Sequence, residues 1–273
     1  MMNNCSDLTQ KYYRDGKLPH IWCPGCGHGI LLNALVRAID NLGLDKDNVC
    51  VVSGIGCSSR ATGYIDFNTL HTTHGRAIAY ATGVKHANPD MTVIVVTGDG
   101  DCSAIGGNHL IHACRRNIDI TTICFNNNIY GMTGGQFSPT TPTGDFATTA
   151  PHGNVDRTFD LCSLAQGAGA TYVGRATAYH ATQLTTLIEN GIKNKGFSFI
   201  EGISVCPTNY GRKNKKGDSV KMLTYLKDNC IDKKIADKKP ELVENKIIIG
   251  ELYNNPSPEY TECYKTIIDK FQD

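Results

Sequence analysis

Two apolar segments, each followed by side chains that carry oxygen, place the strongest constraint on the fold of this 273-residue chain. The first covers residues 92–97 and is followed by Gly-Asp-Gly at 98–100; the second covers 120–126 and is followed by Asn127. Short apolar runs of this kind are typical of strands buried in a parallel sheet, and ligands collect at the carboxyl ends of such strands. The pattern therefore predicts a ligand site at one edge of a sheet.

The Gly-Asp-Gly turn can serve a cation and an anion together. Gly98 and Gly100 let the backbone turn sharply and approach a ligand, and Asp99 offers a hard carboxylate to Mg²⁺. The helix that follows would present unpaired N–H groups to a phosphate. A dinucleotide fingerprint would need a glycine where Ser103 stands, and the sequence has no Walker loop. Alone the triplet is more often an ordinary turn, but with the downstream asparagines it predicts a site for Mg²⁺ and a diphosphate.

Charge and hydropathy exclude other classes of function. The 27 Lys and Arg residues nearly balance the 26 Asp and Glu residues, so no overall field favours nucleic acid or an anionic membrane. No segment approaches the roughly 18 apolar residues needed to span a bilayer, and the polar amino terminus does not resemble a signal peptide. We expect a cytoplasmic protein with neither a nucleic acid nor a membrane as partner.

Helix-like and strand-like patterns alternate along the chain, which predicts an α/β fold with a doubly wound, mainly parallel sheet. Helices are expected at 29–42, 75–87, 105–116, 159–168 and 180–194, and strands at 49–54, 92–97, 120–126 and 197–205. We expect a ligand-binding domain over residues 1–227. The Lys-rich segment 228–273 is expected to be a C-terminal tail that covers a neighbouring subunit.

Four of the twelve cysteines stand in turn-rich settings beside glycine or proline and could converge on one site; they are Cys23, Cys26, Cys57 and Cys206. A four-thiolate set suits zinc or an iron–sulfur cluster, and the Cys-x-x-Cys pair alone slightly favours zinc. A thioredoxin-like redox pair is a simpler alternative, but that motif opens a helix after a strand, whereas this pair follows a polar amino-terminal segment.

Six motifs in one order make the chain resemble the β subunit of 2-oxoacid:ferredoxin oxidoreductases, most of all the 2-oxoglutarate enzymes. They cover residues 23–28, 53–60, 71–76, 98–101, 130–136 and 206–212. The resemblance implies a thiamine-diphosphate-binding fold and a [4Fe-4S] cluster on the four cysteines. Mg²⁺ would be held by Asp99, Asn127 and the main-chain carbonyl of Ile129. Thiamine diphosphate would contact Gly54, Ile55, Gly56, Cys57, His74, Gly100, Asp101, Gly131 and Met132.

The same resemblance implies reversible oxidative decarboxylation of 2-oxoglutarate to succinyl-CoA, with coenzyme A as acyl acceptor and electrons passing through the cluster to ferredoxin. It also implies an α subunit, because a carboxylate for the aminopyrimidine ring normally comes from a separate domain, and it leaves γ and δ subunits open. Arg60 and His74 are the candidate catalytic residues: Arg60 to grip a substrate carboxylate, His74 as a hydrogen-bond donor.

Three alternatives stay open at this point. Some relatives carry Lys where this chain has Gly134, and pyruvate and branched-chain enzymes can carry the glycine form, so a different 2-oxoacid is one alternative. A zinc-stabilised assembly protein would use the four cysteines structurally. A non-oxidative thiamine-dependent decarboxylase would have no use for them.

Overall fold

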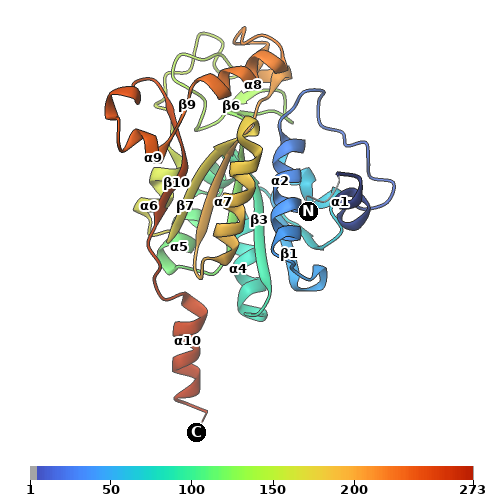
Figure 1. The fold of residues 1–273 in the computed structure, drawn as a ribbon, viewed down its shortest axis with the longest axis vertical. Coiled ribbons are helices and arrows are strands. Elements are labelled where there is room, and N and C mark those ends of the chain that lie inside the picture. Colours follow the sequence, from blue (N-terminus) through green and yellow to red (C-terminus); the bar gives the residue numbers. More distant parts are fainter. Residues whose placement is uncertain (1–4, 273) are drawn as a thin grey trace.

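A computed structural model describes residues 5–272 and contains one large, mostly parallel sheet (Figure 1). Its eight strands lie in the order β2-β1-β3-β4-β8-β7-β10-β9, and a separate two-stranded ribbon pairs β5 with β6. The strands are β1 (Val49–Ser53), β2 (Asn68–His71), β3 (Thr92–Gly98), β4 (Thr121–Asn126), β5 (Ile129–Tyr130), β6 (Gln136–Phe137), β7 (Tyr172–Thr177), β8 (Ser198–Ile203), β9 (Cys230–Asp232) and β10 (Ile247–Asn254).

Helices cover both faces of the sheet. They are α1 (Cys5–Tyr12), α2 (His28–Asn41), α3 (Ala61–Tyr64), α4 (Ala77–Ala87), α5 (Gly107–Arg116), α6 (Leu161–Gly167), α7 (Ala181–Lys193), α8 (Ser219–Asp228), α9 (Lys233–Ala236) and α10 (Tyr260–Asp269). Side chains of α2 and α7 pack into one apolar core, and those of α4, α5 and α6 into another. Along β1, Val51 belongs to the first core and Val52 to the second. This alternation explains why central strands read as continuous apolar runs.

The four strands predicted from sequence are neighbours in the sheet. β1, β3, β4 and β8 pair in that order and all run parallel. Their carboxyl ends therefore meet at one edge, and the segments that leave them carry Cys57, Asp99, Asn127 and Cys206. The predicted fold class is confirmed, and so is the placement of these motifs at a common edge.

The structure extends the sheet beyond the predicted strands. β2, β7, β9 and β10 had not been predicted, and β10 pairs antiparallel with β7. Residues 247–254 thus belong to the main sheet, because the unpaired edge of β7 offers N–H and C=O groups that a strand must cover. The domain division at residue 227 stays a prediction.

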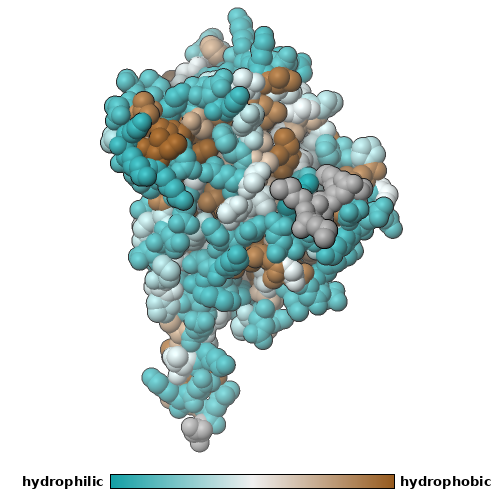
Figure 2. All heavy atoms as spheres, viewed as in Figure 1, coloured by the Kyte–Doolittle hydropathy of each residue, from teal (hydrophilic) through white to brown (hydrophobic). Residues whose placement is uncertain are grey.

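The C-terminal helix α10 projects from the body of the molecule (Figure 1). In the view of Figure 2 its surface is mostly hydrophilic, while apolar atoms gather in the upper left, in the region where Figure 1 labels α9. Within residues 5–272, no helix is long and apolar enough to cross a membrane.

Candidate active site

A cavity of about 130 Å³ opens at the edge where β1, β3 and β4 end. Ten of the residues predicted to bind the cofactor or Mg²⁺ line it: Ile55, Gly56, Cys57, His74, Asp99, Gly100, Asp101, Asn127, Gly131 and Met132. Ile129, whose main-chain carbonyl was predicted as a ligand, also lines it. Fragments from five separate parts of the sequence thus enclose one space, as a single binding site requires.

Asp99 is the more deeply buried of two carboxylates that line this cavity, with only 3% of its surface exposed. Its Oδ2 atom accepts hydrogen bonds from the hydroxyls of Ser138 at 2.5 Å and Thr140 at 2.7 Å. Burial raises the pKa of Asp99, and these hydroxyls oppose the rise only in part. A buried carboxylate of this kind favours a cation beside it, because the cation stabilises the charged form. Sequence reasoning missed Ser138 and Thr140, which come from a loop with no recognisable motif.

The asparagine turn lies beside Asp99. The main-chain N–H of Asn127 hydrogen-bonds to the Asp99 carboxylate. Asn128 has a φ of +62°, and its N–H donates to Asn126 Oδ1 at 2.9 Å, which fixes the turn. Asn127 Oδ1 accepts only a long hydrogen bond of 3.3 Å, from the N–H of Ile129. Carboxylate, amide and main-chain oxygens in one place are the donors that Mg²⁺ takes, so the residues present fit that ion.

Asp101 has a different role from Asp99. Its Oδ1 accepts a hydrogen bond from the N–H of Gly75 at 2.7 Å, and its Oδ2 accepts one from Thr97 Oγ1 at 3.0 Å. A Cβ atom added at Gly54 would lie 2.0 Å from Asp101 Oδ2. The Asp101 carboxylate therefore ties the segments around residues 54 and 75 to the glycine turn, and Gly54 is needed for that close approach.

The two candidate catalytic residues differ in position. His74 lines the cavity and its side chain is exposed. Arg60 is exposed and does not line the cavity. Burial raises the pKa of Cys57 to about 11, and the positive charge of Arg60 opposes this rise in part. Only His74 therefore faces the cofactor cavity directly, and Arg60 lies at its periphery.

The four candidate cluster cysteines lie in one neighbourhood. The Sγ atoms of Cys57 and Cys206 lie 3.5 and 3.7 Å from the point where a Cβ of Gly131 would stand. Burial, together with the thiols of Cys206, Cys57 and Cys23, raises the pKa of Cys26 to about 12. All four are free thiols.

Within residues 5–272, no three His, Cys, Asp or Glu side chains are arranged closely enough to hold a single metal ion. The thiols nevertheless fit an iron–sulfur cluster in kind, because cysteine thiols become thiolates when a metal takes the place of their protons.

Comparison with known proteins places this site in context. Residues 54–202 match the family model of the thiamine pyrophosphate enzyme C-terminal TPP-binding domain. The 2-oxoglutarate synthase subunit KorB of Methanothermobacter marburgensis is 56% identical over 98% of this chain and 95% of its own length. The KorB subunit of Methanocaldococcus jannaschii is 54% identical, over 96% of this chain and 97% of its own length.

A solved structure agrees with these sequence relatives. The 2-oxoglutarate:ferredoxin oxidoreductase from Magnetococcus marinus, with 2-oxoglutarate, coenzyme A and succinyl-CoA bound, superposes with a TM-score of 0.87 at 33% identity. The match covers 97% of this chain and 90% of that one. The likeness therefore extends over the whole sheet and the segments that enclose the cavity.

Proposed function

Because the chain belongs to the family of 2-oxoglutarate synthase KorB subunits, the β subunits of 2-oxoacid:ferredoxin oxidoreductases, we propose that it is the subunit that binds thiamine diphosphate with Mg²⁺. In the proposed reaction the assembled enzyme oxidatively decarboxylates 2-oxoglutarate, transfers the succinyl group to coenzyme A and reduces ferredoxin. The free thiols, which fit a reducing compartment, support a cytoplasmic location.

One observation carries this proposal: the carboxyl ends of β1, β3 and β4 bring a buried carboxylate, an asparagine turn and glycine-rich backbone around one cavity. Asp99, Asn127 and the carbonyl of Ile129 would hold Mg²⁺. The diphosphate would lie against the main chain of Gly100 and of residues 54–57. Thiamine diphosphate supplies the electron sink for decarboxylation when it is bound.

The residues of this chain orient the reaction and shield it from water. His74 is placed to donate a hydrogen bond to a group in the cavity, and Met132 and Ile105 give the cavity apolar walls. Arg60, at the periphery, is proposed to bind the distal carboxylate of 2-oxoglutarate, which the methyl group of pyruvate does not offer.

The thiols of Cys23, Cys26, Cys57 and Cys206 are proposed to hold a [4Fe-4S] cluster. Cys57 lines the cavity, and the sulfur atoms of Cys57 and Cys206 both lie beside Gly131, so electrons leaving the cavity would have a short path to such a cluster. The partners proposed for this chain are an α subunit and ferredoxin as electron acceptor, with γ and δ subunits left open.

The test is anaerobic co-expression with the α subunit, followed by metal analysis and a panel of 2-oxoacids with viologen as electron acceptor. We expect iron, sulfide and Mg²⁺ in the enzyme, with kcat/KM highest for 2-oxoglutarate. Bound zinc without iron would indicate the assembly-protein alternative, and a preference for pyruvate or branched-chain acids would change the substrate. The single chain is the control and should turn over no substrate, because the carboxylate for the aminopyrimidine ring is expected from the α subunit.

A further inference from the structure

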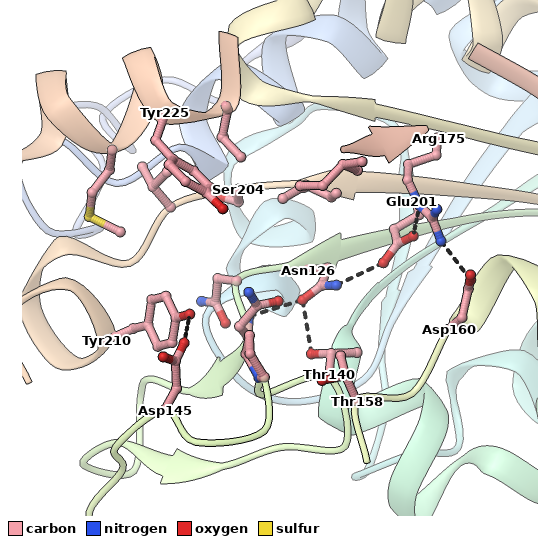
Figure 3. Close-up of a pocket in the computed structure, with 18 of the residues that line it drawn as sticks. Asn126, Thr140, Asp145, Thr158, Asp160, Arg175, Glu201, Ser204, Tyr210 and Tyr225 are labelled. Carbon is pink, nitrogen blue, oxygen red and sulfur yellow. Dashed lines mark hydrogen bonds and ion pairs between the residues drawn. The ribbon is translucent and has the colours of Figure 1, made fainter. Parts of the chain in front are cut away.

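A second, larger cavity of about 750 Å³ lies next to the asparagine turn (Figure 3). Its wall contains a row of polar side chains, which Figure 3 shows running from Asp160 through Arg175 and Glu201 to Asn126 and Thr140. The proposed function does not use Arg175, Glu201 or Asn126. The row nevertheless ends within hydrogen-bond distance of Asp99.

Glu201 lies between Arg175 and Asn126 in this row and is buried, with only 3% of its surface exposed. Its Oε2 accepts a hydrogen bond from Arg175 Nε at 2.6 Å, and its Oε1 accepts one from Asn126 Nδ2 at 2.7 Å. An ionised carboxylate only accepts hydrogen bonds, so Asn126 must turn its NH₂ group toward Glu201. The amide oxygen of Asn126 then has to face the opposite way.

That oxygen is linked to both parts of the proposed Mg²⁺ site, directly to the asparagine turn and through Thr140 to Asp99. Asn126 Oδ1 accepts the hydrogen bond from the N–H of Asn128 that fixes the turn carrying Asn127. It also lies 3.0 Å from Thr140 Oγ1, which is 2.7 Å from Asp99 Oδ2. The Thr140 hydroxyl has one proton, so it can donate to Asp99 or to Asn126 but not to both. One amide oxygen thus fixes the asparagine turn and meets the hydroxyl that orients Asp99.

We propose that Glu201 is a positioning residue for the metal site. By fixing the orientation of the Asn126 amide, it positions the asparagine turn and the Asp99 carboxylate so that both can bind the same cation. This inference rests on the proposed Mg²⁺–diphosphate function. Outer-shell carboxylates act in this way on metal ligands, and their loss typically weakens metal affinity by about 10- to 100-fold.

A purely structural role for Glu201 makes a different prediction. Glu201 would then serve only to neutralise Arg175, and Asp160 shares that task through its 2.6 Å contact with Arg175 Nη2. Replacing either acidic residue by its amide would change stability and leave metal affinity alone. The two carboxylates contact the same guanidinium, but only Glu201 also contacts Asn126, so they form a matched pair.

The experiment measures binding of Mn²⁺, as a paramagnetic substitute for Mg²⁺, to the assembled enzyme with thiamine diphosphate, by electron paramagnetic resonance of the free ion. In Glu201→Gln, the single amide oxygen of the glutamine cannot accept the hydrogen bonds of both Arg175 and Asn126. Its NH₂ group would therefore face an N–H donor on one of these two sides. We expect the Kd for Mn²⁺ to rise about 10- to 100-fold. Asp160→Asn should bind Mn²⁺ like the wild type, and its asparagine can still cap the start of α6.

A second pair of variants tests the link through Thr140, should Glu201→Gln fail to fold. Thr140→Val keeps the shape but removes the hydroxyl and should weaken Mn²⁺ binding at least about tenfold, whereas Thr140→Ser should restore it. Wild-type affinity in Thr140→Val, or in a folded Glu201→Gln variant whose Tm has dropped, would overturn the positioning role. A wild-type enzyme that binds no Mn²⁺ would instead overturn the proposed function itself.

Discussion

The indole N–H of Trp22 donates a hydrogen bond to the main-chain carbonyl of Cys57 at 2.7 Å. This contact joins the Cys-x-x-Cys loop to the segment that leaves β1, two parts of the chain that are 35 residues apart. Trp22 is buried and packs edge-on against Tyr64 with ring centroids 5.0 Å apart. The indole therefore fixes the relative position of two of the segments that carry proposed cluster ligands.

Replacing Trp22 by Phe should keep most of the aromatic packing and leave the Cys57 carbonyl with only the longer hydrogen bond of 3.3 Å from the main-chain N–H of Arg60. Loss of a part-buried hydrogen bond costs about 0.5–1.5 kcal/mol, so we expect a lower Tm and faster loss of the brown cluster absorbance in air. Tyr80→Phe is the control, because Tyr80 is an exposed aromatic residue outside this contact. Equal bleaching rates for the wild type and Trp22→Phe would show that the indole does not protect the cluster.

The cysteines make a sharper test of the cluster. Alanine in place of Cys23, Cys26, Cys57 or Cys206 should remove or convert the electron paramagnetic resonance signal of the reduced [4Fe-4S] centre. Cys50→Ala should not, because Cys50 lies in β1 and packs in the core on one face of the sheet. An unchanged signal in Cys206→Ala would rule out the four-ligand assignment.

Arg60 is the residue on which substrate choice is expected to depend. Arg60→Ala should lower kcat/KM for 2-oxoglutarate by about 30- to 150-fold, since a charge-assisted contact contributes roughly 2–3 kcal/mol. Its effect on pyruvate should be small, because pyruvate has no distal carboxylate. Steady-state kinetics with both substrates measure the difference. Equal losses for both would make Arg60 a structural or cofactor residue.

His28 should make the protein less stable in mild acid. It is buried, and burial lowers its pKa from 6.5 to about 4, so the folded state resists a proton that the unfolded state accepts. Above pH 6.5 the burial of His28 does not change the stability. As the pH falls from 6.5 toward 4, the free energy of unfolding decreases by up to about 3 kcal/mol. The Tm of His28→Asn should therefore depend less on pH over this range than that of the wild type. Parallel pH profiles for the two proteins would contradict this assignment.

Local patterns were sufficient to predict the strands that form the site. β1, β3, β4 and β8 are buried on both faces. The first three read as mostly apolar runs, and all four are followed by glycine, asparagine or cysteine motifs. Strands at the outer positions of the sheet were missed. β2 is partly exposed and has no such run, and β10 is an antiparallel strand whose pairing with β7 depends on residues about 75 positions apart.

The sequence by itself determined which residues could do the chemistry: Asp99 after one buried strand, Asn127 after the next, and cysteines in glycine-rich turns. Only the tertiary structure decided how these residues are held. The loop that supplies Ser138 and Thr140 folds back onto Asp99 from about 40 positions away, and Glu201 reaches Asn126 across 75 positions. The physical reason is that apolar periodicity is a local property of a chain, whereas a buried polar group takes its partner from whichever segment the fold brings beside it.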